Sequence, residues 1–202
     1  MKAKVITLPE IQIETAQVEI VGTTGLLCQR MGQKAMNQLR ESGKAGKGKG
    51  KPRVIPSPED QFKECLYPYP SGGYGFPAKG FLLSCIRVSK TVGMHMVDAA
   101  TSGFRFIGEF NGEDYVVKID GTPEIHESTV ILNKTVRSPR YRALFPAWTT
   151  KLTVKYNPTI FDLQQIVNLL QYAGHHVGVG EWRPERRGDF GTFTIKPTNQ
   201  KG

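Results

Sequence analysis

The fold of this chain is indicated most clearly by residues 150–195, TKLTVKYNPTIFDLQQIVNLLQYAGHHVGVGEWRPERRGDFGTFTI. From Lys151 to Lys155 polar and apolar side chains alternate, which indicates a half-buried strand. Apolar residues at helical spacing predict a helix at about 160–173, and Gly174 is a typical helix stop. A glycine-rich loop and a closing strand, FGTFTI, follow. The stretch therefore predicts a strand–helix–strand unit.

The N-terminal part of the chain predicts a related unit that contains insertions. TAQVEIV, residues 15–21, alternates as a half-buried strand does. Apolar residues at helical spacing then predict a helix from Leu27 to about Arg40. A short helix is expected to begin at Ser57-Pro58, with the serine as its N-cap, and a longer helix at Pro77.

The middle of the chain changes to strand patterns. FRFIGEF, DYVVKID and ESTVILN are the candidate strands, and Asn111-Gly112 is a typical hairpin turn between the first two. Two β-α-β halves that share one antiparallel sheet predict an α+β, ferredoxin-like fold with helices on one face and insertions. Because the sequence shows neither an internal repeat nor a second core, residues 1–202 are expected to form a single domain.

The charge of the chain favours an anionic partner. Its 202 residues include 27 Lys or Arg and 18 Asp or Glu, a net charge of +9. Such an excess attracts anions over long range and releases counterions from nucleic acids. The three cysteines are far apart and lack zinc or redox spacing, which favours a reducing compartment. Without a signal-peptide pattern or 18 consecutive apolar residues, we expect a cytoplasmic protein that does not enter a membrane.

A basic, glycine-rich segment interrupts the N-terminal half of the chain. GKAGKGKGKPR, residues 43–53, contains four glycines, five basic residues and no acidic residue. Since it offers little apolar surface to bury, a flexible basic loop is expected at residues 43–56. Two interpretations remain open: a solvated linker, or an arm whose Lys47 and Lys49 contact phosphates.

The loop before the last strand is the first candidate binding site. Glycines let backbone amides approach phosphates, arginine forks match phosphate oxygens, and an indole ring can stack on an unpaired base. The candidate nucleic-acid-binding residues of this loop are Gly178, Gly180, Gly188, Trp182, Arg183, Arg186 and Arg187. The alternative is a structural loop whose glycines form turns and whose tryptophan fills the core.

A second candidate region precedes the strand at 150–156. Residues 134–155 contain six basic residues and no acidic one. Arg137, Arg140 and Arg142 are expected to line the same groove as the glycine-rich loop, with Tyr141 as a second stacking platform. The alternative is an ordinary solvated face with Phe145 and Trp148 buried.

Motifs for catalysis, metal binding or a cofactor are not recognisable in the sequence. It contains no HExxH, Walker A or nucleophile-elbow pattern. His175 and His176 stand beside the glycine-rich loop, and a strand would place His126 with Glu124 as surface charge. We therefore expect a non-enzymatic protein without catalytic residues, metal or cofactor.

Two short motifs resemble a known superfamily. GTTGLL at residues 22–27 is similar to the GTTPLL signature that follows the first strand of RAMP-superfamily proteins, although Gly25 replaces the usual proline. Residues 173–193 resemble the glycine-rich loop between the last helix and the last strand of that superfamily. The whole chain also resembles a set of bacteriophage proteins through YGFPA (74–78), YRALFPAW (141–148) and GEWRPE (180–185).

These resemblances carry expectations about function. RAMP proteins are ferredoxin-like RNA binders of CRISPR effector complexes, and the chain is most similar to their backbone subunit, which polymerises along RNA. The resemblance therefore implies a RAMP/RRM-like fold, a single-stranded RNA or DNA partner with RNA favoured, a homo-oligomer or filament along the strand, and a host-bacterial cytoplasm. Two alternatives stay open: a phage structural or assembly protein, and a RAMP-like endoribonuclease that uses a histidine.

Overall fold

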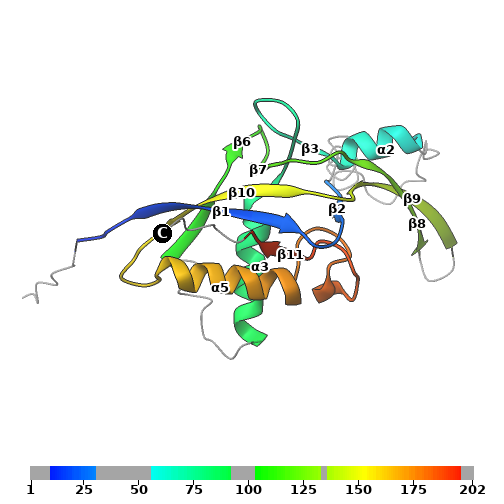
Figure 1. The fold of residues 1–202 in the computed structure, drawn as a ribbon. Helices are drawn as coiled ribbons and strands as arrows, with labels where there is room; N and C mark the ends of the chain where they lie inside the picture. The colour runs from blue at the N-terminus through cyan, green and yellow to red at the C-terminus, as the bar shows by residue number, and fades with distance from the viewer. Residues whose placement is uncertain (1–9, 31–55, 92–102, 133–135, 197–202) are drawn as a thin grey trace, which may run out of the picture.

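A four-stranded sheet forms the centre of the protein in the computed structural model, which describes residues 10–30, 56–91, 103–132 and 136–196 (Figure 1). The strand order is β11-β1-β10-β5, and each pairing is antiparallel. The bounds of these strands are Glu14–Gly22 for β1, Phe104–Ile107 for β5, Thr149–Tyr156 for β10 and Phe193–Ile195 for β11.

The alternating pattern of β1 and β10 explains their place in the middle of this sheet. Val18 pairs with Leu152, and both side chains are buried. Their neighbours Glu19 and Lys151 also pair and point to the opposite face, where they form a 3.3 Å ion pair. The sequence prediction of both strands is confirmed.

Two long helices lie on the same side of the sheet, α3 (Ala78–Thr91) and α5 (Leu163–His176) (Figure 1). α5 begins at Asp162, whose side chain accepts a 2.7 Å hydrogen bond from the Gln165 amide in a capping box. The helix was expected to stop at Gly174, which is wrong, because Gly174 lies inside it. A Cβ there would come within 2.2 Å of the Phe193 carbonyl oxygen, so glycine allows α5 to contact β11 closely.

A second sheet, β2-β9-β8, extends to one side of the first (Figure 1). It comprises β2 (Leu26–Cys28), β8 (Glu124–Leu132) and β9 (Val136–Phe145), and α2 (Pro58–Cys65) packs against β9. The expected serine cap of α2 is present, since Ser57 Oγ accepts a 3.1 Å hydrogen bond from the Asp60 amide. A third sheet, β3-β4-β7-β6, comprises Tyr67–Pro68, Tyr74–Pro77, Tyr115–Ile119 and Glu109–Phe110 in that order.

One local prediction is wrong and another is confirmed. A helix was expected to begin at Leu27, but this residue belongs to strand β2. Leu26, Leu27 and Cys28 are all buried and pair with the end of β9. Residues 31–40 of the expected helix and residues 43–55 of the basic loop lie outside the described residues. The hairpin turn expected at Asn111-Gly112 is confirmed: it joins β6 to β7 through residues 111–114, and Asn111 Oδ1 accepts hydrogen bonds from the two amides of Glu113 and Asp114.

The described residues therefore form an α+β structure with antiparallel sheets and three α-helices. One hydrophobic cluster contains residues from all three sheets and all three helices, with Ile20, Phe81, Phe145 and Ile166 among the fully buried side chains. None of the described helices is long and apolar enough to span a bilayer.

Candidate functional site

The glycine-rich loop between α5 and β11 is fixed to the rest of the protein by backbone hydrogen bonds. The Val179 amide donates to the Gly191 carbonyl (2.9 Å), and the Glu181 amide donates to the Leu27 carbonyl (2.8 Å). From α3, Ser84 Oγ donates to the Gly178 carbonyl (2.9 Å). The loop thus has a defined conformation that is anchored to β2 and α3.

The candidate glycines of this loop are required by its own backbone. Gly178 and Gly180 have φ of 70° and 80°, in the left-handed region that favours glycine. A Cβ at Gly180 would lie 2.6 Å from the Leu27 carbonyl oxygen, and one at Gly188 would lie 2.0 Å from the Trp182 carbonyl oxygen. These glycines therefore have a structural role, and their contact with a ligand stays a prediction.

The three candidate arginines of the loop differ in their availability. The Arg183 guanidinium donates to Glu185 Oε2 (2.7 and 3.0 Å) and to the Gly180 carbonyl (2.8 Å), and its side chain is mostly buried. Arg87 of α3 contacts the same Glu185 oxygen at 2.6 Å. Arg186 and Arg187 are exposed and make no ion pair among the described residues. Only these last two offer free guanidinium groups to solvent.

Trp182 is half-buried in a cluster that joins the loop to the β8–β9 hairpin. The guanidinium carbon of Arg142 lies 4.9 Å from the centroid of its ring. The His126 ring contacts both Trp182 and Phe190, at centroid distances of 6.1 and 5.4 Å. His126 was expected to be simple surface charge beside Glu124, and this is wrong because its ring packs against the loop.

Arg142 is nearly buried, although its partners are neutral. Its Nε donates to Gln29 Oε1 (2.7 Å), and its Nη1 donates to Ser128 Oγ (2.6 Å). No carboxylate of the described residues lies within ion-pair distance of it, and burial lowers the pKa of its guanidinium while Glu181 opposes that shift. A buried cation without a direct counterion costs solvation free energy, which ordinary packing alone does not recover.

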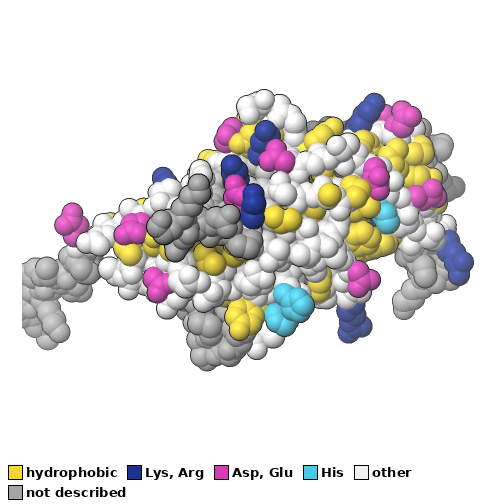
Figure 2. Space-filling view, in the orientation of Figure 1, with side chains coloured by type: hydrophobic (Ala, Val, Ile, Leu, Met, Phe, Trp, Pro, Cys, Tyr) yellow, Lys and Arg dark blue, Asp and Glu magenta, His cyan; other side chains and the backbone are white. Residues whose placement is uncertain are grey.

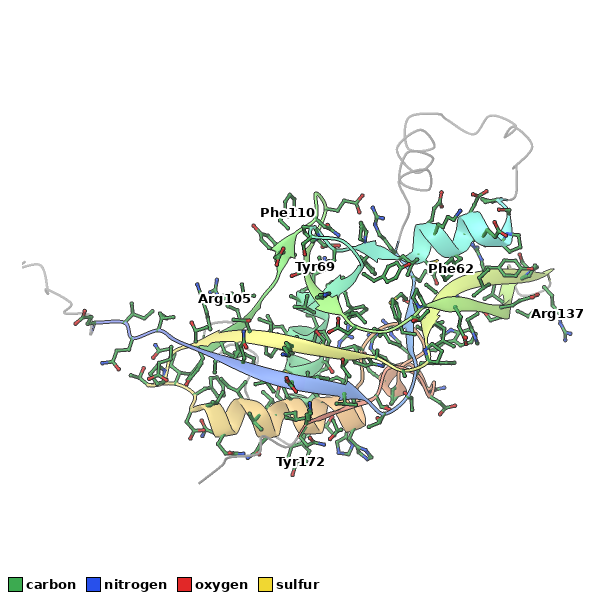
Figure 3. The ribbon with its side chains drawn as sticks, turned by 45° about the horizontal axis from the view of Figure 1, so that its top comes forward. Phe62, Tyr69, Arg105, Phe110, Arg137 and Tyr172 are labelled. Atoms are coloured by element: carbon green, nitrogen blue, oxygen red, sulfur yellow. The ribbon has the colours of Figure 1, made fainter. Side chains whose placement is uncertain are left out.

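The four candidate residues of β9 do not share one face. In the β8–β9 hairpin Arg142 pairs with His126 and Arg140 with Ser128, so both arginines point to the face that meets the loop. Tyr141 and Arg137 alternate with them and point to the opposite face. Arg137 also lies at the far end of the hairpin (Figure 3). The structure therefore brings Arg140 and Arg142, but not Arg137 and Tyr141, to the side of the glycine-rich loop.

The net charge of the chain is concentrated outside the described residues. The described part contains 16 basic and 16 acidic residues, whereas residues 31–55 alone contain seven basic residues and one acidic residue. On the face shown in Figure 2, the described Lys and Arg side chains are dispersed among acidic ones and do not form a continuous basic patch. Lys47 and Lys49 belong to the segment outside the described residues.

The histidines and cysteines of the described part of the chain do not form a metal site. No set of three His, Cys, Asp or Glu residues there could hold a metal ion. His175 and His176 are exposed at the end of α5, with their rings 4.8 Å apart. Cys28, Cys65 and Cys85 are buried free thiols, and burial raises the pKa of each.

Sequence reasoning missed the residues that fix this cluster. Gln29, Ser128 and Phe190 carry no motif, because their role arises only from the pairing of β8 with β9 and from the return of the loop to β2. Conversely, residues 22–27 and the end of the glycine-rich loop lie side by side: Thr23 and Thr24 donate backbone hydrogen bonds to Thr192, and Gly191 donates to Gly25. No protein-family model matches the chain, and a search of curated proteins finds no match either.

Proposed function

We propose that this protein binds single-stranded nucleic acid, RNA in preference to DNA, without catalysing a reaction on it. The binding surface is the junction of the glycine-rich loop with the β8–β9 hairpin. The observation that carries the proposal is the 4.9 Å contact of Arg142 with Trp182, because it joins two arginine-containing segments that are far apart in the sequence. Arg186 and Arg187 of the loop and Arg140 of the hairpin then serve as phosphate contacts.

The order of the central strands supports a ferredoxin-like, RAMP-like unit as the frame of this surface. The order β11-β1-β10-β5, with α3 and α5 on one side, corresponds to two β-α-β halves on one antiparallel sheet. The likeness of GTTGLL and of the glycine-rich loop to RAMP motifs favours RNA, a cytoplasmic location and oligomerisation along the strand.

The distribution of charge along the chain suggests separate roles for two regions, one that attracts the strand and one that positions it. The described part of the chain carries equal numbers of basic and acidic residues, so its net charge supplies no long-range attraction. The excess lies largely in the segment with Lys47 and Lys49, which would attract the strand and release counterions. The loop–hairpin surface would then fix the position of the strand.

Binding to three matched ligands tests the proposal. Titrations of the full chain with single-stranded RNA, single-stranded DNA and a duplex of one sequence are expected to give tightest binding to the RNA. Binding should weaken steeply with added salt, because phosphate contacts release counterions. Tighter binding to the duplex, or no binding to any ligand at low salt, would contradict the proposal. Loss of the bound RNA by cleavage would contradict the non-catalytic assignment.

A further inference from the structure

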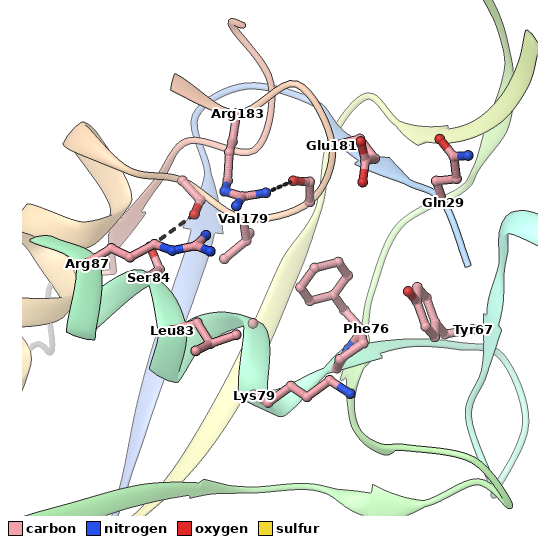
Figure 4. Close-up of a pocket in the computed structure, with 14 residues that line it drawn as sticks. Gln29, Tyr67, Phe76, Lys79, Leu83, Ser84, Arg87, Val179, Glu181 and Arg183 are labelled. Atoms are coloured by element: carbon pink, nitrogen blue, oxygen red, sulfur yellow. Dashed lines mark hydrogen bonds between the residues drawn. The ribbon is translucent and has the colours of Figure 1, made fainter. Parts of the chain in front are cut away.

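A cavity of about 230 Å³ lies between α3 and the glycine-rich loop, next to the junction with the hairpin (Figure 4). It is lined by Gln29, which follows β2, and by residues from β3, β4, α3 and the loop, so it depends on several elements of the fold. Pockets for drug-sized ligands occupy roughly 300–1,000 Å³. The volume of this cavity therefore suits one planar ring system rather than a larger ligand.

The floor of the cavity is aromatic and apolar. Phe76 is held edge-on by Tyr67 and Phe81, at centroid distances of 6.0 and 5.8 Å. Gly80 of α3 gives the ring its room, because a Cβ there would come within 2.7 Å of a Phe76 ring carbon. Leu83 extends the apolar surface and is partly exposed. Such a surface is suited to the face of an unpaired base.

Glu181, Gln29 and Tyr67 lie to one side of Phe76, while Arg87 and Arg183 lie to the other (Figure 4). The half-buried carboxylate of Glu181 makes no hydrogen bond or ion pair with any described residue. The Tyr67 hydroxyl likewise has no hydrogen-bond partner in the described part of the chain, and burial raises the pKa of Tyr67. Gln29 accepts from Arg142 through Oε1, which leaves its amide NH2 as a donor. The cavity thus presents a carboxylate that can accept two hydrogen bonds, Glu181, beside two hydrogen-bond donors, the Tyr67 hydroxyl and the Gln29 amide.

We infer that this cavity binds one nucleobase with two adjacent N–H donors and a neighbouring carbonyl, which is guanine. The carboxylate of Glu181 accepts from the ring N–H and the exocyclic amine of the base, and Tyr67 or Gln29 donates to its carbonyl oxygen. Adenine and cytosine would place a ring-nitrogen lone pair against the carboxylate, and uracil offers it a single N–H. The inference rests on the proposed function, to which it adds preference at a single nucleotide position.

The test compares equal-length uridine strands that carry guanine, inosine or adenine at one central position. Fluorescence anisotropy with the full chain is expected to show about tenfold tighter binding of the guanine strand than of the inosine or adenine strand. Inosine lacks the exocyclic amine, and adenine places a ring-nitrogen lone pair against the carboxylate. Glu181→Gln should reduce this preference, measured as the ratio of the variant's affinities for the guanine and adenine strands, to within about twofold. Glu59→Gln, which removes an exposed carboxylate from α2, is the matched control and should retain the preference. Tyr67→Phe should weaken the preference without changing the far-UV circular dichroism spectrum.

A parallel titration with free guanosine and adenosine separates failure of the inference from failure of the proposed function. Strand binding that ignores the central base, or a preference that survives Glu181→Gln, overturns the inference and leaves the proposed function standing. If no strand binds, the proposed function fails. In that case a thermal shift by guanosine that Glu181→Gln abolishes would support the cavity as a nucleoside site, and no shift would overturn it.

Discussion

The guanidinium of Arg142 stacks 4.9 Å from the ring centroid of Trp182, and this contact connects the β8–β9 hairpin to the glycine-rich loop. Both side chains are withdrawn from bulk solvent, Arg142 to 6% exposure. Desolvation strengthens a cation–π contact from about 0.5–1 kcal/mol to about 2 kcal/mol. This pair therefore contributes to the relative position of the hairpin and the glycine-rich loop.

Trp182→Ala should lower the free energy of unfolding by roughly 3 kcal/mol, because Phe190, His126 and Arg142 lose the ring that they contact. Urea unfolding of the variant, of Arg142→Met and of the double variant would form a double-mutant cycle. A coupling free energy of about 1–2 kcal/mol is expected. Strict additivity would show that the pair does not join the two segments.

Gly191→Ala should destabilise the protein far more than Gly112→Ala. Both glycines have positive φ, 72° and 98°, so both alanines carry the left-handed cost of roughly 1–2 kcal/mol. Only at Gly191 would the new Cβ meet backbone, 1.7 Å from the Val179 carbonyl oxygen, whereas nothing lies within 4 Å at Gly112. Thermal melts of the two variants measure the difference. Equal melting temperatures would mean that the loop does not approach itself this closely.

The contribution of Glu19 to stability should depend on pH. Hydrogen bonds from Lys196 and Lys151 lower the pKa of Glu19 below its ordinary value of 4.5. A carboxylate whose pKa is lower in the folded state stabilises the protein when the pH is above its pKa in the unfolded state. This stabilisation is lost as the pH falls through its pKa in the folded state. The Glu19→Gln variant should therefore have a slightly lower melting temperature than the wild type at pH 7, and the same melting temperature at pH 2–3. A difference that persists in acid, or is insensitive to salt, would assign the effect to another cause.

Much of the fold could be predicted from local patterns. The alternation in β1 and β10, the serine cap of α2 and the apolar stripe of α5 act within a few residues, and each element forms where its pattern stands. Gly174 misled the prediction of the end of α5, because its small size serves contact with Phe193 and not a helix stop. β2 was missed because burial and pairing with β9 override the helical spacing of its residues.

The candidate site was less predictable, because it depends on contacts across the fold. Spacing in the sequence cannot show that Arg183 is neutralised by Glu185 or that Arg140 and Tyr141 point to opposite faces of a hairpin. The cavity residues Glu181, Tyr67 and Gln29 come from three distant segments and share no motif. The sequence did correctly predict that the β9 arginines approach the glycine-rich loop, since Arg142 contacts Trp182 of that loop.

The basic segment at residues 43–53 should supply much of the salt dependence of binding. Replacement of its five basic residues by glutamine removes up to five phosphate contacts, so the slope of log K against log salt should fall by up to about 3.5 for a single strand. The melting temperature should stay within a few degrees, because the segment is expected to be dispensable for the fold. An unchanged slope would identify it as a linker.

Removal of the two free loop arginines tests whether the loop–hairpin surface binds the strand. Arg186→Ala/Arg187→Ala and the control Arg105→Ala/Lys155→Ala lose the same charge, but Arg105 lies at the opposite end of the molecule from the hairpin tip (Figure 3). The quantity to measure is the affinity for single-stranded RNA across a salt series. If the loop–hairpin surface binds the strand, the loop variant should weaken binding strongly and lower the slope by about 1.4, and the control should change both little. Equal effects of the two variants, or unchanged binding by the loop variant at low salt, would contradict the account.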